Sequence, residues 1–399
     1  MHASGPVVLF AGGLAGDGVA RNTVHLANAL ARRGVPVEII CLKGGALAAE
    51  LRGPTVTCLG RGRGPRALAL AAAVPALHRR LKALEPSVVL SMGNHGHLAC
   101  WGALRGLPDT PRLYRISNDP AHGGAAQRAL RELGLSVVAA DATRLVCVSA
   151  GIAAAEPFRR ARRDGRVRVL PNGVDADAIR ERAARPARHP WLADGRPYLV
   201  AVGRLHRQKN YEGLIDALAL ARRERPDLRL LVLGGGPAGL RRALEARAEA
   251  AGVSGAVRFE GEVANPFPLV AAARAYVLPS LWEGASNSLL EAMACGVPIV
   301  ASRTAGAAAD VLEGGRHGVL VDPAAPADLA RAILRQADPA TCIPPGGRAA
   351  AFRLDAMLAR LCAVVASARL LHDENQMLAE RPRHLARLSQ AARGQSTEY

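Results

Sequence analysis

The sequence predicts an α/β protein built from two doubly wound domains that face each other across a cleft. Short apolar runs alternate with helix-like stretches from the start of the chain, which indicates parallel strands joined by crossover helices. A second series of the same kind begins after a polar, proline-containing segment at residues 185–197. The length of 399 residues also favours two or three domains over one. Sheets of this kind bind ligands at the carboxyl ends of their strands, so two in series predict a cleft between them.

The elements can be placed in order along both series. In the first series a helix pattern over residues 18–34 ends at Gly34, and apolar runs predict strands over residues 6–12, 35–42, 87–93, 111–117 and 143–149. In the second series the predicted strands cover residues 198–203, 228–236, 256–262, 275–280, 297–302 and 318–322, with helical stretches between most of them. We therefore expect a first domain over residues 1–180, a second domain over 186–371 that ends in a crossover helix, and a basic tail over 372–399.

The composition restricts the possible partners. Half of the residues are hydrophobic and only 3% are aromatic, so the core consists mainly of Ala, Val and Leu, with few stacking platforms for nucleic acid strands. The net charge of +18 favours a phosphate-bearing partner, although nearly all of it is arginine that could be spread over solvated faces. The seven cysteines lie mostly inside apolar runs, which is typical of reduced cysteines in a cytosolic protein. The first residues show no basic leader, and no run is long enough to span a membrane.

A basic, helix-like stretch covers residues 61–86. Its centre is apolar and its cations lie toward the ends: Arg61, Arg63, Arg66, Arg79, Arg80 and Lys82. A crossover helix of the first domain is the simpler interpretation. The alternative is docking on an anionic membrane surface, which would place a cytoplasmic protein at the inner membrane face.

Two cations lie on the loop that follows the first strand of the second series. Arg204 comes directly after this strand, and Lys209 comes just before the next helix. A guanidinium fork and an ammonium group on one loop suit a diphosphate, and the helix N-terminus adds a favourable dipole. The alternative is a pair of exposed loop cations.

A glycine pattern favours a different class of enzyme. Gly234, Gly236 and Gly239 follow a strand and precede a helix, with the spacing of a dinucleotide fingerprint. This would indicate an NAD(P)-dependent oxidoreductase, but the match is isolated and Pro237 lies within it. The glycine-rich turn after the first strand of the chain does not support an NAD site either. The next strand leads to Lys43, where an NAD enzyme needs an acidic residue for the ribose.

The candidate metal ligands are weak. Asp175 and Asp177 form the pattern by which some sugar-nucleotide enzymes hold a divalent metal, but in this polar junction a turn or helix start is the simpler interpretation. His95 and His97 have no partnering Asp or Glu close in sequence, and the nearest cysteine, Cys100, lies in an apolar run. We therefore assign no metal and no cofactor.

Two carboxylates stand out in the segment 280–300, "SLWEGASNSLLEAMACGVPIV". Glu283 and Glu291 lie eight positions apart, the first beside a glycine and the second among apolar residues. Ser288 and Glu291 have the spacing of a capping box, in which case Glu291 would only start a helix and Glu283 would be a loop residue.

The combination of motifs resembles a known family. "GRLHRQKN", "VLPNGVD" and above all "PSLWEGASNSLLEAMACGVPIVAS" followed by "GVLVDP" are similar to the family 4 retaining glycosyltransferases, which have the GT-B fold of two Rossmann-like domains. The resemblance covers most of the chain and is strongest in the C-terminal half, where Glu283 and Glu291 form the family's E-x7-E. It implies that the cleft binds a nucleoside-diphosphate sugar without a metal.

The resemblance also implies roles for individual residues. Arg204 and Lys209 would stabilise the diphosphate that departs, Glu283 would face the donor sugar as an orienting group, and Glu291 would hold the ribose hydroxyls. Gly12 and Gly13 would let the N-terminal loop approach the phosphates. Backbone N–H groups around the donor would come from Gly284, Ala285, Ser286, Asn287, Ser288 and Leu289.

One departure from the family bears on the donor sugar. Many members carry a His where this chain has Ser117-Asn118-Asp119, so Asn118 is a candidate replacement. The resemblance implies a retaining transfer of sugar to a glycan or lipid-linked acceptor in cell-surface polysaccharide synthesis, such as lipopolysaccharide synthesis. A sugar-nucleotide epimerase or a phosphorylase of the same fold, and the oxidoreductase, are the alternatives.

Overall fold

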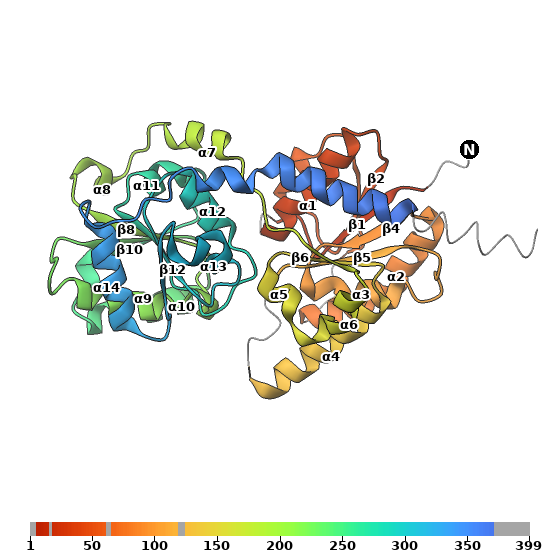
Figure 1. Cartoon of the computed structure of the whole chain (residues 1–399), viewed down its shortest axis with the longest axis horizontal. Coiled ribbons are helices and arrows are strands. Elements are labelled where there is room, and N and C mark those ends of the chain that lie inside the picture. Colours follow the sequence, from red (N-terminus) through yellow and green to blue (C-terminus); the bar gives the residue numbers. More distant parts are fainter. Residues whose placement is uncertain (1–4, 16–17, 61–64, 119–123, 371–399) are drawn as a thin grey trace, which may run out of the picture.

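Two α/β domains lie side by side in the computed structural model, which describes residues 5–15, 18–60, 65–118 and 124–370 (Figure 1). Each domain is built on one sheet, and every strand pair in both sheets is parallel. The predicted fold class is therefore confirmed. The predicted tail over 372–399 lies outside the described residues.

The first sheet has seven strands in the order β3-β2-β1-β4-β5-β6-β7. They are β1 (Val7–Ala11), β2 (Val37–Cys41), β3 (Thr55–Cys58), β4 (Val88–Ser91), β5 (Arg112–Ile116), β6 (Arg144–Cys147) and β7 (Val167–Val169). The five inner strands are those that the apolar runs predict. The two edge strands, β3 and β7, were not predicted, because their residues are partly or fully exposed and form no apolar run.

The second sheet has six strands in the order β10-β9-β8-β11-β12-β13. They are β8 (Tyr198–Val202), β9 (Arg229–Leu233), β10 (Val257–Gly261), β11 (Ala275–Leu278), β12 (Ile299–Ser302) and β13 (Val319–Val321). All six coincide with predicted runs. Inner strands of a parallel sheet are buried on both faces, which makes such runs continuous and easy to recognise.

Helices cover both faces of each sheet, so each domain has two apolar layers. In the first domain, α1 (Gly18–Ala31) lies on one face, and the other carries α2 (Arg66–Leu84), α3 (His97–Ala103), α4 (Ala125–Asp141), α5 (Ala150–Ala154) and α6 (Arg159–Arg163). In the second, α9 (Tyr211–Ala221), α10 (Ala238–Ala250) and α14 (Pro326–Ala337) cover one face. The opposite face carries α7 (Ala176–Ala183), α11 (Phe267–Ala271), α12 (Asn287–Ala294) and α13 (Ala308–Val311), and α8 (Pro190–Ala193) precedes β8.

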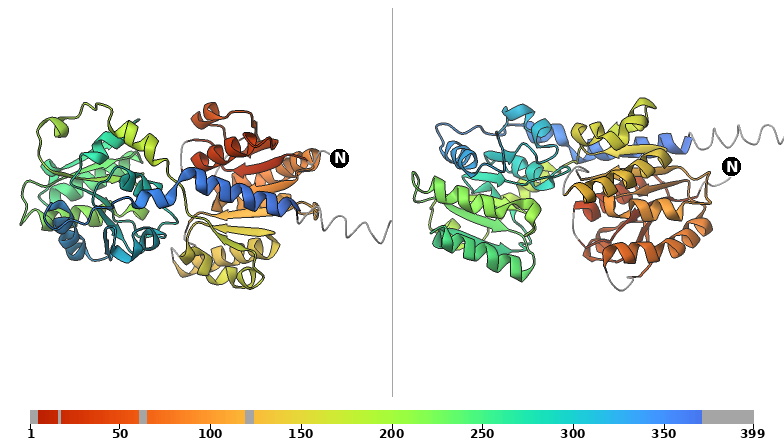
Figure 2. Two further views of the ribbon diagram at one scale, coloured as in Figure 1. Left: turned by 45° about the horizontal axis from the view of Figure 1, so that its top comes forward. Right: turned by 90° about the horizontal axis from the view of Figure 1, so that it is seen from below.

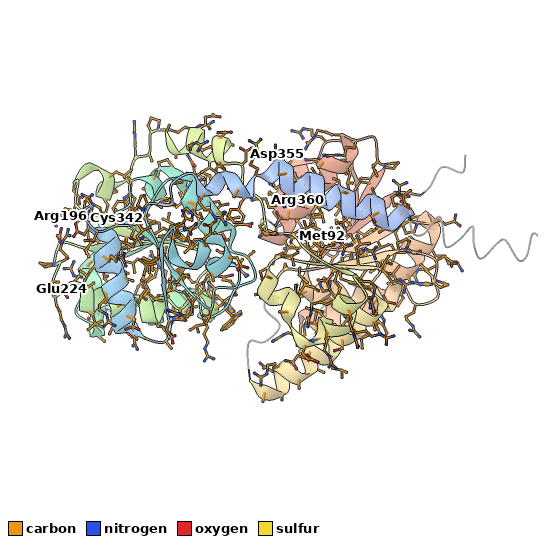
Figure 3. The ribbon with its side chains drawn as sticks, viewed as in Figure 1. Met92, Arg196, Glu224, Cys342, Asp355 and Arg360 are labelled. Atoms are coloured by element: carbon orange, nitrogen blue, oxygen red, sulfur yellow. The ribbon has the colours of Figure 1, made fainter. Side chains whose placement is uncertain are left out.

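The chain crosses between the domains at two neighbouring places. Val174 forms an isolated parallel bridge with Arg353, with hydrogen bonds from Val174 N to Phe352 O (2.7 Å) and from Leu354 N to Val174 O (3.0 Å). The helical residues 354–370 then pack on the first domain beside α1, as Figures 1 and 2 show. Asp355 and Arg360 mark this helix in Figure 3. The domains are thus tied together along one side.

The strand orders identify where a ligand should bind. In each sheet the chain adds strands on one side of its first strand and then moves to the other side. This reversal lies between β1 and β4 in the first domain and between β8 and β11 in the second domain. Ligands of open parallel sheets bind beyond the carboxyl ends of the strands at this reversal. The loop after β8 carries Arg204 and Lys209, and the loop after β11 carries Glu283.

Two further sequence expectations can be compared with the structure. No helix among the described residues is long and apolar enough to cross a membrane. The cysteines are free, as expected, but Cys41 and Cys58 have their sulfur atoms 3.5 Å apart on neighbouring strands, a proximity that their sequence spacing does not reveal.

Candidate active site

Glu283 and Lys209 form an ion pair at the reversal point of the second sheet. Lys209 Nζ lies 2.6 Å from Glu283 Oε1, and the two side chains are only 17% and 10% exposed. Ser280 Oγ donates to the same carboxylate oxygen (2.9 Å), and Gln208 Nε2 donates to the other (3.2 Å). Sequence reasoning gave no role to Ser280 and Gln208, although both lie inside the motifs that predict the site.

Arg204 and Lys209 therefore differ, although both lie on the loop after β8. Arg204 is exposed and makes no hydrogen bond or ion pair with any residue that the structure describes. Lys209 is already paired with a carboxylate. The description of two exposed loop cations fits Arg204 and is wrong for Lys209.

Gly284 brings the two domains into direct contact. A Cβ atom on Gly284 would lie 2.0 Å from Ser117 O and 2.8 Å from Asn118 Cα, so only glycine fits this approach. The loop after β5, where the sequence places Asn118, thus faces the loop that carries Glu283. Asn94 supports this loop, since its Oδ1 accepts from Ser117 N (2.8 Å).

The first turn of α12 points toward the same region. Its N-cap residue is Ser286, whose side chain makes no capping hydrogen bond, so the first-turn N–H groups of Asn287, Ser288 and Leu289 have no side-chain partner there. Such a turn attracts anions. Ser288 lies inside the helix and its Oγ contacts Tyr276 Oη (2.7 Å), so the capping-box interpretation of Ser288 and Glu291 is wrong.

Glu291 lines a cavity of about 200 Å³ between the domains. Its carboxylate makes no hydrogen bond with any described residue, and burial raises its pKa, an effect that the positive charges of Arg21 and Arg182 oppose. The remaining walls come from α1, α7, α11, α12 and the domain crossing: Asn22, His25, Gly173, Val174, Asp175, Ala178, Ile179, Phe267, Asn287 and Leu354. Glu283 is absent from this wall, so the two glutamates serve neighbouring regions of the cleft.

The N-terminal glycine loop lies at the carboxyl end of β1. Gly12 and Gly13 follow this strand, and Leu14 N donates to Lys43 O (3.2 Å). A Cβ atom on Gly18, at the start of α1, would lie 3.1 Å from Asn287 Nδ2. The start of α1 and the start of α12 therefore approach each other across the cleft.

Two of the three glycines in the dinucleotide-like pattern, Gly234 and Gly236, have a packing explanation, whereas a Cβ atom on Gly239 would meet nothing within 4 Å. A Cβ atom on Gly234 would lie 2.2 Å from Gly203 O, and one on Gly236 would lie 2.5 Å from the Leu205 side chain. These glycines thus let the loop after β9 pack against the loop after β8. The fingerprint also follows the second strand of its sheet, away from the reversal point at which a dinucleotide would bind.

The weak metal candidates have other partners. Asp175 is the N-cap of α7 and accepts from Ala178 N (3.0 Å), and Asp177 pairs with Arg180, so the helix-start interpretation is confirmed. His97 is buried, and its Nδ1 lies 2.7 Å from Ser91 Oγ. Among the described residues, no group of three or more His, Cys, Asp or Glu side chains could hold a metal ion.

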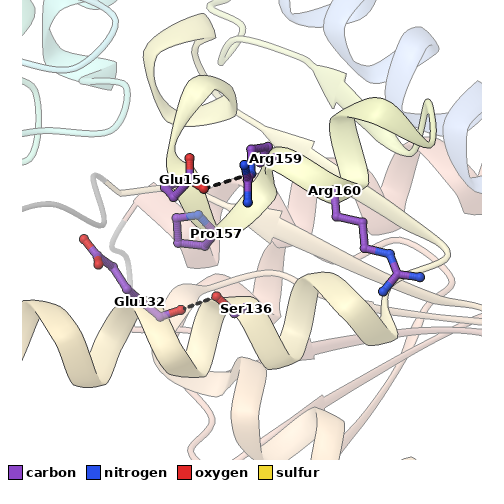
Figure 4. A pocket seen from close by; sticks show the side chains of 6 residues that line it. All are labelled: Glu132, Ser136, Glu156, Pro157, Arg159 and Arg160. Atoms are coloured by element: carbon purple, nitrogen blue, oxygen red, sulfur yellow. Dashed lines mark hydrogen bonds and ion pairs between the residues drawn. The ribbon is translucent and has the colours of Figure 1, made fainter.

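A second hollow of about 270 Å³ lies outside the cleft (Figure 4). It separates α4 from the segment 156–160, and its lining combines Glu132 and Glu156 with Arg159 and Arg160. Glu156 and Arg159 pair with each other at 2.9 Å, and both are largely exposed. The cavity at Glu291 is the better candidate for the site, because the strand ends of both sheets face that region.

Two parallel-sheet domains that meet at Gly284 and Ser117, with a lysine–glutamate pair and an uncapped helix start beside this contact, define a GT-B protein. The chain belongs to glycosyltransferase family 4. A family model described as Glycosyltransferase Family 4 matches residues 16–178, and one described as Glycosyl transferases group 1 matches residues 196–338. The family resemblance predicted from the motifs is therefore confirmed in both domains.

Known relatives agree with this assignment. The chain is 34% identical to a D-inositol 3-phosphate glycosyltransferase of Thermomonospora curvata over 236 residues, which is 55% of this chain and 54% of the relative. It is 38% identical to a GDP-mannose-dependent alpha-(1-6)-phosphatidylinositol monomannoside mannosyltransferase of Mycolicibacterium smegmatis over 38% of this chain and 42% of the relative. The chain thus spans about half the length or less of these curated relatives.

The fold agrees over nearly the whole chain. The sucrose-phosphate synthase of Thermosynechococcus elongatus superposes with a TM-score of 0.74 at 22% identity, covering 91% of this chain and 98% of the other. This similarity shows the shared GT-B fold.

Proposed function

We propose that this protein transfers a sugar from a nucleoside-diphosphate sugar to a glycan or lipid-linked acceptor with retention of configuration. The observation that carries the proposal is the Lys209–Glu283 pair, which lies at the strand reversal beside the uncapped start of α12. Membership of a glycosyltransferase family supports it. The comparisons give no support to the oxidoreductase, the epimerase or the phosphorylase.

In the proposed reaction, different residues act on the diphosphate of the donor and on its sugar and ribose. The bond between the sugar C1 and the diphosphate oxygen breaks, and a bond from the acceptor oxygen to C1 forms on the same face, while the acceptor proton passes to the departing phosphate. Arg204, Lys209 and the α12 N-terminus stabilise the negative charge that develops on the diphosphate. Glu283, held by Lys209, orients the sugar, and Glu291 accepts from the ribose hydroxyls in its cavity.

The remaining predicted contacts lie on the first domain and on the loop after β11. Gly12 and Gly13 leave room for the phosphates near the start of α1, and Asn118 faces the donor sugar from the loop opposite Gly284. The backbone N–H groups of residues 284–289 surround the donor. One relative is named for GDP-mannose and a lipid acceptor, and the other for an inositol phosphate, so both free and lipid-linked acceptors suit this chain.

A lipid-linked acceptor requires access to a membrane, and the first domain exposes the side chains for it. Leu130 and Leu133 project from α4, beside exposed Arg128, and Leu68 is exposed on α2. Apolar side chains flanked by arginine suit an anionic membrane surface. Of the cations predicted in the stretch 61–86, Arg80 is engaged with Glu38 (2.8 Å), while Arg61 and Arg63 lie outside the described residues.

A donor panel tests the proposed function. The protein is incubated with UDP-glucose, UDP-galactose and GDP-mannose, and release of the nucleoside diphosphate is measured with and without candidate acceptors. We expect release from one donor that rises with acceptor and yields a product of retained configuration by NMR. Oxidation of an alcohol with NAD(P), without release from any donor, would contradict the proposal.

A further inference from the structure

Asn172 connects the two domains from inside the interface. It lies between β7 and the domain crossing, and it is only 7% exposed. Its Nδ2 donates both to Ala285 O (3.0 Å) and to Asn287 Oδ1 (2.7 Å), on the loop and first turn that begin α12. Its Oδ1 accepts from Arg115 Nη2 (2.5 Å) on β5. Three side chains, Arg115, Asn172 and Asn287, thus form a chain of hydrogen bonds from the first domain to the second.

The chemistry of these groups fixes the direction of every bond. A guanidinium can only donate, so Asn172 must turn its oxygen to Arg115 and its NH₂ group to the second domain. Asn287 must then turn its oxygen to Asn172, which directs its own NH₂ group away. That NH₂ group lies next to Gly18 at the start of α1, where a Cβ atom would be 3.1 Å from Nδ2. Asn287 also lines the cavity that contains Glu291.

Arg115 is an unusual residue for this position. It is 2% exposed, and no carboxylate of the described residues pairs with it. Burial lowers its pKa to about 10, so it remains charged at neutral pH. A buried, unpaired cation lowers stability, and an apolar side chain of similar size would pack there at lower cost. The orientation that Arg115 gives to Asn172 explains its presence.

We propose that Arg115 and Asn172 are positioning residues that fix the Asn287 amide with its NH₂ group toward the donor diphosphate. This inference rests on the proposed function, because it assumes an anionic donor in the cleft. The amide nitrogen lies between the N-termini of α1 and α12, and both helix ends favour the same negative charge. Asn287 is therefore the group that touches the ligand, and the other two act through it.

The substitution Asn172→Asp separates orientation from packing. An aspartate still accepts from Arg115, but it cannot donate to Asn287, so Asn287 turns its NH₂ group to the new carboxylate and its oxygen to the donor. We expect the affinity for the nucleoside diphosphate in calorimetric titration to fall about tenfold, equivalent to about 1.4 kcal/mol. Asn287→Ala should weaken binding less than Asn172→Asp does. Adding Asn172→Asp to Asn287→Ala should have little further effect on the affinity.

The matched control is Asn28→Asp on α1. The Asn28 amide, like that of Asn172, both donates and accepts: Nδ2 donates to Glu50 O and Oδ1 accepts from Arg52 N. It lies outside the cleft, so its variant should bind like the wild type. If Asn172→Asp fails to fold, Arg115→Met replaces it, because loss of the guanidinium frees the Asn172 amide to rotate. Arg115→Met should lower the affinity by a smaller factor than Asn172→Asp. In a protein that already carries Asn287→Ala, Arg115→Met should have no further effect. If the wild type binds UDP or GDP and Asn172→Asp or Arg115→Met binds it equally well, the inference is wrong but the proposed function is not contradicted. Wild-type protein that binds no nucleoside diphosphate would overturn the proposed function as well.

Discussion

Replacing Glu291 by Gln should raise the stability of the free protein and weaken nucleotide binding. Burial raises the pKa of Glu291 above its ordinary value of 4.5, and no described residue hydrogen-bonds the carboxylate. A group whose pKa is raised by folding makes its full stabilising contribution below its unfolded pKa and loses it as the pH rises through the folded value. The charged carboxylate is therefore unfavourable near neutral pH, and an uncharged Gln removes this penalty.

The effect on binding has the opposite sign. A carboxylate accepts from both ribose hydroxyls, whereas an amide offers one acceptor oxygen and must turn its NH₂ group toward the other. Hydrogen bonds to a charged group contribute roughly 1.5–3 kcal/mol and neutral ones about 1 kcal/mol. A difference of about 1.4 kcal/mol corresponds to tenfold weaker binding of the nucleoside diphosphate.

Two measurements on the same variant check this reasoning. Calorimetric titration gives the affinity, and thermal unfolding gives the melting temperature, which should exceed that of the wild type near neutral pH and converge with it below about pH 4.5. The control is Glu212→Gln on the exposed first turn of α9, which should change neither quantity. Unchanged affinity would remove Glu291 from the ribose site, and a lower melting temperature would contradict the burial argument.

Four further predictions concern the rest of the site. Lys209→Met leaves the Glu283 carboxylate without its ion pair, so the free energy of unfolding in denaturant titration should fall by about 1–3 kcal/mol and turnover by about 100- to 1,000-fold. Arg204→Gln should reduce turnover similarly but leave the unfolding free energy unchanged because this side chain is exposed; a wild-type rate would exclude it from the mechanism. Gly284→Ala should clash with Ser117 O, increase the radius of gyration in small-angle X-ray scattering and abolish turnover, and normal activity would refute the close approach of the domains. Activity should survive EDTA and dialysis, whereas loss restored by Mn²⁺ or Mg²⁺ would indicate a metal site.

The inner strands could be predicted from sequence because burial on both faces makes them mainly apolar, even where a charged residue such as Glu38 or Arg115 lies among them. The edge strands β3 and β7 could not, since their side chains are mostly accessible and form no apolar run. The packing of residues 354–370 on the first domain was also outside the reach of the sequence, because an apolar helix face does not specify which sheet it covers.

In the candidate site, too, some features could be predicted from the sequence and others could not. The E-x7-E spacing identified Glu283 and Glu291 because both lie on one continuous segment around α12. The Lys209–Glu283 contact joins residues 74 positions apart and appears only when β8 and β11 pair. The alternative interpretation of Ser288 and Glu291 as a capping box is wrong because the helix begins before Ser288. Asn172 belongs to a motif that was recognised, but its partner Arg115 lies in a different strand.

The central claim is that the cleft binds a nucleoside diphosphate, and a thermal-shift panel of UDP, GDP, ADP and NAD tests it most directly. A ligand that binds only the folded protein stabilises it by about 2.7 kcal/mol at 100 times its dissociation constant. We predict that UDP or GDP raises the melting temperature by about 5 °C or more, that NAD does not, and that the shift is smaller in Glu291→Gln. Stabilisation by NAD alone would contradict the claim.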